Sequence, residues 1–569
     1  MRSILKYRFY LVTVIFLGLT FPGLKAKDSL VNILKEELDR EVKELSAQNP
    51  PLYYLDYRVD DISSYNLRAS FGSLVGKSNS HNRFLTVMVR VGDYSFDNTH
   101  ELQGNFSMSE QMEVLASSLP FENEPDAIKQ ILWRLSDQAY KNASSKYTAL
   151  QNMNLPSSDN DNIGDFSKEE PSAYYDPPFS EQELAINEDE WSKRLQEYTS
   201  IFGNDSLIFD SEASLNVIMQ RNYLLTSEGT CIVQNLKYCQ LQFVSSIRHI
   251  SGVVLPVQKS YTAFQISDLP SHETMLKDFH QLYNKLLTMN QTVIAEPYAG
   301  PAILSPEATG VFFHEIFGHR VEGHRLESLD DGQTFKDKLG NDVLPEEFQV
   351  YSDPTLRVWN SQDLIGAYHY DDQGINSQRV ILVKDGILQG FLMSRRPTQE
   401  FIHSNGHGRA QPGYAPVSRQ SNLIIESSKP YSDDELRKML IKECKKQKKE
   451  YGYYFKEVTG GLTFTDRYNA NVFNIDPIEV YRVYVDGRSD ELVSGVELIG
   501  TPLTMFSNII AAGENKEVFT GFCGAESGHI PVTTIAPAVL VRKIETQKAP
   551  EYDSQLPLLP NPDRSFNRK

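Results

Sequence analysis

The sequence predicts an α+β protein, with a mixed α/β N-terminal domain and a largely antiparallel β C-terminal domain that carries a metal-binding helix. Three observations lead to this prediction. Stretches that alternate apolar and polar residues are typical of strands, and they are interspersed with stretches of helical periodicity. Proline and glycine cluster between residues 297 and 301 and indicate a domain boundary. Beyond that boundary, one apolar helix contains His314, Glu315 and His319.

The predicted N-terminal domain covers residues 27–290. Its expected elements are a helix over 29–48, strands over 53–57, 67–74 and 83–91, a helix over 125–145, strands between 206 and 264, and a helix over 272–289. The acidic, proline-containing segment of about 154–183 has no periodicity, so we expect a loop or linker that makes a mobile excursion from the domain.

The predicted C-terminal domain covers residues 291–545. Its metal-binding helix begins clearly, because Ser305 is a favourable N-cap, Pro306 suits the first helical position and Glu307 complements the helix dipole. Asp-Gly pairs at 385–386 and 486–487 predict tight hairpins, and residues 433–444 form a charged helix. Residues 546–569 are polar and proline-bearing, which predicts a disordered tail.

The start of the chain is typical of a secretory signal peptide over residues 1–26. Basic residues precede an apolar run at 9–21, and residues 23–26 form a plausible cleavage site. The run is shorter than the roughly 20 residues that span a bilayer, so we expect an exported periplasmic or extracellular bacterial protein without a stable membrane anchor. A retained membrane anchor is the alternative. The segment near the cleavage site contains no cysteine, so the sequence gives no lipoprotein signal.

Charge and cysteine content restrict the functional classes. The net charge of −19 argues against nucleic-acid binding as the main task, because a phosphate backbone would repel such a surface. Export makes a Cys231–Cys239 disulfide across a hairpin possible, and two independent thiols are the alternative. Cys444 is expected to be structural or idle.

The pattern His-Glu-x-x-x-His at residues 314–319 indicates metal chemistry. Neutral imidazoles bind a borderline-soft cation, and an adjacent carboxylate can accept a proton from activated water. Five residues advance roughly 140° beyond a full helical turn, so both imidazoles reach one ion only if the helix widens into a π-bulge, ends or bends between them. Gly318 supplies a place for that distortion.

Several readings of this segment remain open at the level of residues. His314 and His319 could be satisfied core or surface histidines, but the combination with Glu315 in an apolar helix favours a metal site. His324 is a candidate third ligand, although we expect it at the helix exit. Glu322 could support a ligating histidine from outside the coordination sphere or be a solvated residue.

The segment 295–305 leading into His-Glu-Ile-Phe-Gly-His-Arg-Val-Glu-Gly-His resembles the TldD half of the TldD/PmbA family of metallopeptidases. Further matches follow in collinear order between about residues 290 and 545, at 370–374, 383–390, 406–409, 493–500 and 521–531. Several spaced motifs in the right order are more specific than a single motif.

The resemblance implies a His₂Cys zinc site, one ion per active subunit, with Cys523 as the third ligand beside His314 and His319. A thiolate suits zinc, and three protein ligands leave a position for water. It also implies a peptidase in which Glu315 is the catalytic base, acting on flexible or unfolded peptides. The family pattern further implies a dimer, either a homodimer or a heterodimer with a PmbA/TldE-like partner.

Other roles remain open. Arg409, His407, Tyr414 and His369 are candidates for stabilising the charge of the transition state. The alternative function is a non-catalytic or regulatory subunit with a structural metal, although such a site has no use for Glu315. Another zinc hydrolase, such as an amidase, would use the same ligands, and the sequence distinguishes neither the peptide that is cut nor zinc from iron.

Overall fold

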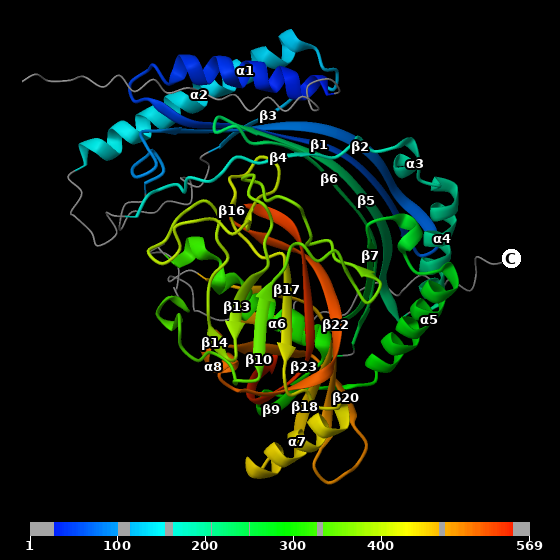
Figure 1. The fold of residues 1–569 in the computed structure, drawn as a ribbon. Helices are drawn as coiled ribbons and strands as arrows, with labels where there is room; N and C mark the ends of the chain where they lie inside the picture. Colours follow the sequence, from blue (N-terminus) through cyan, green and yellow to red (C-terminus); the bar gives the residue numbers. More distant parts are fainter. Residues whose placement is uncertain are drawn as a thin grey trace, which may run out of the picture.

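The computed structural model describes residues 28–100, 114–153, 163–205, 207–249, 251–326, 334–465 and 473–549. It has the α+β fold that the sequence predicts: a curved seven-stranded sheet wraps around a second half that is built on a twelve-stranded sheet (Figure 1). The predicted signal peptide lies outside the described residues. Among the described helices, none has both the length and the apolar character required to cross a bilayer.

The first sheet consists mainly of long antiparallel strands. Its strands are β1 (Leu52–Ser70), β2 (Ser73–Val91), β3 (Val114–Ser118), β4 (Ala173–Tyr175), β5 (Ile208–Thr226), β6 (Cys231–Arg248) and β7 (Val254–Ala263). They are ordered β3-β2-β1-β5-β6, and both the short parallel strand β4 and the antiparallel strand β7 pair with β6. Within the described residues β7 pairs with no other strand, so one of its edges is free.

Helices cover the outer, convex side of this sheet at both ends (Figure 1). They are α1 (Ser29–Leu45), α2 (Pro125–Asn152), α3 (Glu181–Leu184), α4 (Glu188–Ser200), the 3₁₀ turns η2 (Ile201–Asn204) and η3 (Ile266–Asp268), and α5 (His272–Met289). Leucines of α1 and α2 join one core with β1 and β2, and Phe279 of α5 stacks on Tyr198 and Phe243 in a second core. The concave side faces the second half of the chain.

The second half begins with β8 (Val293–Ile294), β9 (Tyr298–Leu304) and α6 (Pro306–Ile316). The 3₁₀ turns η4 (Gly318–Val321), η5 (Gly323–Leu326) and η6 (Lys336–Lys338) follow, and then β10 (Phe348–Ser352), β11 (Val358–Trp359), β12 (Gln362–Asp363), β13 (Val380–Lys384), β14 (Ile387–Leu388), β15 (Gly408–Arg409), β16 (Val417–Ser418) and β17 (Asn422–Ser427). The remaining elements are α7 (Asp433–Lys446), β18 (Tyr451–Thr463), β19 (Phe473–Tyr484), β20 (Glu491–Ser494), β21 (Val496–Gly500), α8 (Pro502–Phe506), β22 (Ile509–Ala525) and β23 (Gly528–Lys548).

The twelve-stranded sheet is largely antiparallel, as predicted. Its main order is β14-β13-β10-β17-β23-β9-β18-β19-β20-β8, and β22 pairs only with β23 among the described strands. The parallel pairs are β17–β23, β18–β9 and β20–β8. Helix α6 contacts β23, β18 and β22, and its fully buried Phe312 and Phe313 belong to the main core. The metal-motif helix is therefore a central element of this half.

Most of the local predictions are confirmed. The helices expected at 29–48, 125–145, 272–289, 305 onward and 433–444 are α1, α2, α5, α6 and α7. The hairpin between β13 and β14 turns at Asp385 and Gly386, whose φ angles of 51° and 76° explain the Asp-Gly preference. Residue 487 has φ 88° in the turn between β19 and β20.

Three predictions about segments are wrong. The strand expected at 67–74 crosses a turn, because Phe71 and Gly72 adopt φ angles of 46° and 83° and reverse the chain between β1 and β2. The tail does not begin at residue 546, since β23 continues to Lys548 and pairs with β9 and β21. Residues 154–162 of the expected loop lie outside the described residues, and the rest is mostly irregular, as predicted. This rest is not an excursion from the domain, because β4 pairs with β6 and Phe166 is buried against Arg395.

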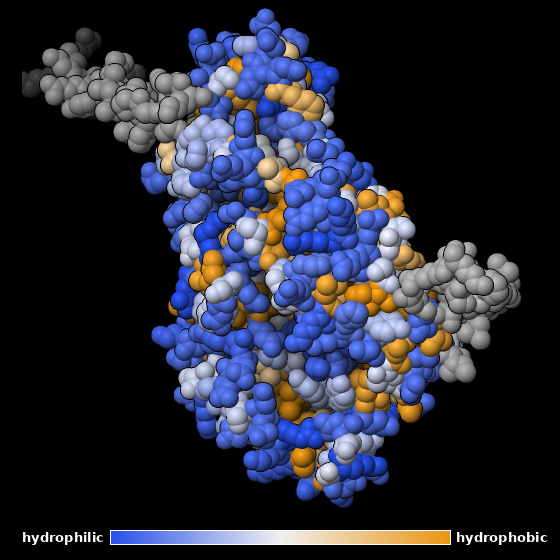
Figure 2. Space-filling model, turned by 90° about the vertical axis from the view of Figure 1, so that its right-hand side faces the viewer, coloured by the Kyte–Doolittle hydropathy of each residue, from blue (hydrophilic) through white to orange (hydrophobic). Residues whose placement is uncertain are grey.

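The cysteines are free thiols. Cys231 and Cys239 lie eight positions apart on the single strand β6, so an extended chain separates them by roughly 26 Å and a disulfide between them is excluded. Cys444 lies on α7, where it is buried in a core cluster with Leu436 and Leu440 of the same helix. The face of the molecule on the α5 side is mostly hydrophilic, with apolar residues in small groups (Figure 2), consistent with the acidic composition.

Candidate metal centre

Helix α6 ends between the two histidines of the motif. Ser305 caps it by accepting a hydrogen bond from the Ala308 N–H at 3.1 Å. The α-helix stops at Ile316, and the tighter 3₁₀ turn η4 carries His319. Of the distortions expected near Gly318, the structure therefore shows a helix end and not a π-bulge. Gly318 is required for close packing, because a Cβ atom there would overlap the side chain of Gln420.

The structure brings His314, His319 and Cys523 together from segments that are about 200 residues apart. One ligand atom of each residue lies within 4.8 Å of the others, and all three residues are buried. The Cys523 Sγ lies 3.3 Å from His319 Nε2, and the two imidazole rings have centroids 4.9 Å apart. Cys523 reaches this position near the end of β22, where the strand turns back into β23.

Charge interactions favour a thiolate at this site. Burial raises the pKa of Cys523, but the adjacent imidazoles of His319 and His314 outweigh burial and lower this pKa well below its ordinary value. Burial conversely lowers the pKa of His319, and the Cys523 thiolate and Glu322 outweigh it and raise that pKa. These interactions favour the thiolate form of Cys523, which is the form of the sulfur that binds metal.

Glu315 lies next to His314 on the helix and is buried. Its side chain packs directly on Gly461 of β18, where a Cβ atom would clash with it. Arg320 fixes the backbone here by donating to the Glu315 carbonyl oxygen at 2.7 Å and to Thr463 of the same strand at 2.9 Å. The Glu315 carboxylate itself accepts no hydrogen bond from another described residue, so it is available for a substrate or water.

Glu322 holds His319 from the side opposite to the thiol. Its Oε2 lies 3.2 Å from His319 Nδ1, which leaves Nε2 directed at Cys523. Glu322 is fully buried, yet the charges of His319, Arg325 and Arg419 outweigh the effect of burial and lower its pKa to about 2. Of the two readings of Glu322, the solvated residue is wrong, because Glu322 is a buried partner of His319.

Two arginines anchor the hairpin that carries Cys523. Arg419 is fully buried and donates to the Cys523 carbonyl oxygen at 2.7 Å, the Ser527 hydroxyl at 2.8 Å and the Gly528 carbonyl oxygen at 3.1 Å. The Nε atom of Arg419 lies 3.6 Å from the Glu322 carboxylate. Arg325 forms a bidentate pair with Glu526 at 2.6 and 2.8 Å. These contacts join the cysteine hairpin to the partner of His319.

The residues fit a zinc ion by the chemistry of their donor atoms. Two imidazole nitrogens and a thiolate sulfur are typical zinc ligands, with bonds of about 2.0–2.3 Å that place ligand atoms roughly 3–4 Å apart. The 3.3 Å between Cys523 Sγ and His319 Nε2 agrees with that spacing. His314, His319 and Cys523 are also the only group of this kind among the described residues.

The other candidates from the sequence have different places. His407 is buried against Ser352 and Asn405, and burial lowers its pKa to about 3, so it is a neutral structural residue. Arg409 binds the carbonyl oxygens of Gln420 and Pro531. Tyr414 is half exposed, and the ring of His369 packs on Tyr174. His324 lies 3.8 Å from Glu526 and outside the ligand group.

Sequence reasoning missed Arg325, Arg419, Gln420 and Glu526. Each is a polar residue in a stretch with no helical or strand periodicity strong enough to place it. The one available signal was the run of polar residues at 418–422, which leads into the strand β17 and is buried throughout. Buried polar residues need partners, and here the partners are the backbone around the metal ligands.

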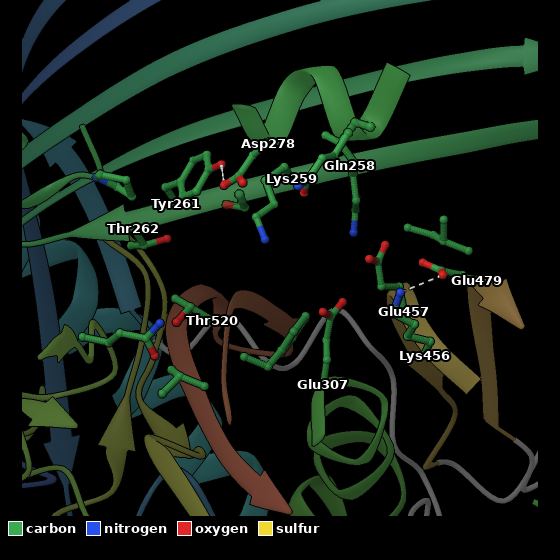
Figure 3. Close-up of a pocket in the computed structure, with 18 of the residues that line it drawn as sticks. Gln258, Lys259, Tyr261, Thr262, Asp278, Glu307, Lys456, Glu457, Glu479 and Thr520 are labelled. Carbon is green, nitrogen blue, oxygen red and sulfur yellow. Dashed lines mark hydrogen bonds and ion pairs between the residues drawn. The ribbon is translucent and has the colours of Figure 1, made fainter. Parts of the chain in front are cut away.

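A cleft of about 980 Å³ lies beside the N-terminal end of α6 (Figure 3). One wall is the free edge of β7 with Lys259 and Tyr261, and the opposite wall includes Thr520 on the free edge of β22. Glu307 of α6 points into the cleft (Figure 3). The residues of the metal motif and Cys523 do not line the cleft, but two of its elements continue toward them: α6 runs from Glu307 to Glu315, and β22 runs from Thr520 to Cys523.

The fold and this site define a class: an α+β protein with a buried group of two histidines and one cysteine that could hold a metal ion, and with an adjacent glutamate. Residues 297–548 match the PmbA/TldA metallopeptidase C-terminal domain. Over these residues the chain is similar to the TldD/PmbA family.

Curated relatives agree with this similarity. The chain is 29% identical over 241 residues to a metalloprotease of Methanothermobacter thermautotrophicus, a match that covers 42% of this chain and 48% of that protein. It is 26% identical over 265 residues to the zinc metalloprotease TldD homolog of Saccharolobus solfataricus, covering 45% and 54%. The chain thus spans about half the length of the curated relatives it matches.

Solved structures share the fold over almost the whole chain. TldE from Thermococcus kodakarensis superposes with a TM-score of 0.59 at 14% identity, covering 91% of this chain and all of that chain. A putative modulator of a DNA gyrase from Thermotoga maritima gives a TM-score of 0.60 at 14% identity, covering 90% of this chain and all of that chain. At this identity, the likeness shows the fold alone.

Proposed function

We propose that this protein is a zinc-dependent peptidase that hydrolyses flexible or unfolded peptides. The observation that carries the proposal is the convergence of His314, His319 and Cys523 within 4.8 Å beside Glu315. The family similarity and the names of the relatives support metallopeptidase chemistry. Glu315 distinguishes this proposal from a purely structural metal, because such a site needs no free carboxylate.

The residues have separate roles in the proposed reaction. His314, His319 and Cys523 would hold zinc, which supplies Lewis acidity and makes a water molecule acidic near neutral pH. Glu315 accepts the proton of the attacking water and donates it to the amine that leaves. Glu322 fixes the orientation of the His319 ring, and Arg320 holds the Glu315 backbone in place.

The cleft provides a route for an extended peptide. The edges of β7 and β22 both face it, and within the described residues neither edge pairs with another strand. A peptide that adds to either edge is recognised mainly through its backbone, which suits unfolded segments of varied sequence. Folded proteins pair most of their backbone groups internally and so offer few such segments.

The experiment compares the zinc-loaded wild type with Glu315→Gln on quenched-fluorescent unstructured peptides, and measures bound metal for both. We expect Glu315→Gln to keep zinc and to lose at least about 100-fold in kcat, the lower end of general-base contributions. Glu181→Gln, an exposed glutamate on α3, is the matched control and should behave as wild type. Full activity of Glu315→Gln would exclude its role as base.

We also propose that the protein is exported and acts as a dimer, with itself or with a TldE-like partner. The basic and apolar start of the chain supports export, and the TldE-like fold supports the partnership. The mass of the protein from the cell envelope should show cleavage after residue 26, and light scattering should give the mass of two subunits. An intact N-terminus in the cytoplasm would contradict export, and a monomer would contradict the dimer.

A role as a non-catalytic subunit is not favoured, because the ligand set and Glu315 are both present.

A further inference from the structure

The charges of the cleft are unbalanced. Its described lining has three lysines and six carboxylates: Lys259, Lys285 and Lys456 against Asp268, Asp278, Glu307, Asp363, Glu457 and Glu479. A cleft lined by an excess of one charge attracts ligands of the opposite charge. The excess here is negative, so a positively charged group is favoured.

Two of the three lysines are already neutralised within the wall. The Lys285 ammonium forms ion pairs with Glu457 and with Glu479, the latter at 2.6 Å, and Lys456 pairs with Glu479 at 2.8 Å. Burial raises the pKa of Glu479, but the hydrogen bonds from Lys285, Lys456 and Tyr481 outweigh it and lower this pKa to about 2. These lysines and Glu479 therefore form a closed network with little capacity for a ligand.

Glu307 is in a different situation. None of the described lysines or arginines forms an ion pair with it, although Lys259 faces it from the β7 wall (Figure 3). Burial and the charge of Glu457 raise its pKa to about 7. The Val458 backbone and the charge of Lys259 offset this shift only in part. A partly desolvated carboxylate without an ion-pair partner among the described residues gains from a charged group that enters with a ligand.

The position of Glu307 relates it to the proposed chemistry. Helix α6 rises about 1.5 Å per residue, so Glu307 and Glu315 lie roughly 12 Å apart along the axis. An extended peptide covers that distance in about three or four residues at roughly 3.3 Å each. A side chain on a peptide bound along the edge of β7 or β22 would therefore reach Glu307 at a fixed distance from the bond that is cut.

We propose that this cleft selects peptides that carry a lysine or arginine side chain three or four residues from the scissile bond, with Glu307 as the residue that receives the positive charge. This inference rests on the proposed peptidase function and adds a substrate class to it. Backbone pairing alone would bind any unfolded peptide, whereas a carboxylate at a set distance makes one position sensitive to charge. Glu307 is then a specificity-determining residue, separate from the metal ligands and from Glu315.

The test uses peptides of one sequence in which a single lysine, glutamine or glutamate is moved along the chain. For the zinc-loaded wild type we expect kcat/KM to favour lysine over glutamate by about tenfold or more, at a position three or four residues from the cut. Glu307→Gln should reduce that ratio to near one. Asp268→Asn removes the same charge from the exposed rim of the cleft and is the matched control, which should keep most of the preference.

A binding measurement separates this inference from the proposed function. Anisotropy of the same labelled peptides with the zinc-loaded Glu315→Gln protein reports charge preference without hydrolysis. Preferential binding of the lysine peptide that disappears with Glu307→Gln supports the selectivity even if no peptide is cut. Equal binding of lysine and glutamate peptides, no binding of either, or an equal loss of preference in Asp268→Asn and Glu307→Gln would overturn the assignment.

Discussion

Arg419 offers a direct test of how the metal centre is assembled. It is fully buried and makes three hydrogen bonds to the hairpin that carries Cys523, while its Nε faces the carboxylate that orients His319. Replacing it by methionine removes these donors and leaves Glu322 with one fewer cation. Hydrogen bonds from charged groups contribute about 1.5–3 kcal/mol each but do not add, and breaking a buried charge network costs about 3–5 kcal/mol in total.

Replacing Arg419 should weaken zinc binding by the folded protein in addition to destabilising the fold. Partners outside the coordination sphere typically change metal affinity by about 10–100-fold. We expect Arg419→Met to lower zinc affinity within that range, and Arg419→Lys to recover part of it, because lysine keeps the charge but not the planar set of donors. Chelator competition on the folded protein gives the zinc affinity, and denaturant unfolding of the metal-free protein gives the stability.

Arg395→Met is the matched control. Arg395 is also fully buried and pairs with Glu228 and the Ser167 carbonyl oxygen, but it has no contact with the ligands. The Arg395→Met substitution should lower the free energy of unfolding by a similar amount and leave the zinc affinity of the folded protein unchanged. The reasoning is refuted if Arg419→Met binds zinc as wild type does, or if both variants weaken zinc equally.

Two further predictions concern the thiol and the charged cleft. Cys523→Ser should weaken zinc binding by more than about 100-fold, which exceeds the effect of losing a partner outside the coordination sphere. Cys444→Ser removes another buried free thiol and should leave the zinc affinity unchanged. Equal zinc affinity in both variants would remove Cys523 from the ligand set. Lys285→Met should destabilise the protein by about 1–2 kcal/mol at pH 6. Because the pKa of Glu479 is lowered to about 2, its ion pair with Lys285 stabilises the folded protein fully above the ordinary carboxyl pKa. This stabilisation is lost as the pH falls toward 2. The difference from wild type in urea unfolding should therefore shrink between pH 5 and pH 3, and a difference independent of pH would contradict the role of this ion pair.

The sequence predicted correctly those helices and turns that depend on residues close together in the chain. The cap at Ser305, the periodicity of 272–289 and the Asp-Gly turn at 385–386 depend on residues within one turn of each other, and all three are confirmed. The turn at Phe71 and Gly72 was missed because Phe71 adopts a positive φ that its residue type does not indicate. The strand at 546–548 was missed because its partners, β9 and β21, lie far away in sequence.

In the candidate site, too, residues that are neighbours in sequence could be predicted, and residues placed by distant contacts could not. The motif at 314–319 was visible because its residues are neighbours, and its unusual spacing required a distortion near Gly318, which the structure shows as a helix end. Cys523 came from the family resemblance alone, because no spacing rule relates it to His314. Arg419 and Gln420 could not be predicted, since their partners are backbone atoms of segments about a hundred residues away.

Residues 419 and 420 explain why distant segments meet at one point. The two side chains leave the chain next to each other, and each contacts a different part of the site. Arg419 binds the backbone of the Cys523 hairpin, while Gln420 packs on Gly318 and lies 3.4 Å from the His314 carbonyl oxygen. The helix must therefore end where Gln420 approaches it, and the hairpin must lie where Arg419 holds it. The spacing of five is compatible with one site because the helix ends between the two histidines, since in a continuous helix the side chains of His314 and His319 would diverge by about 140°.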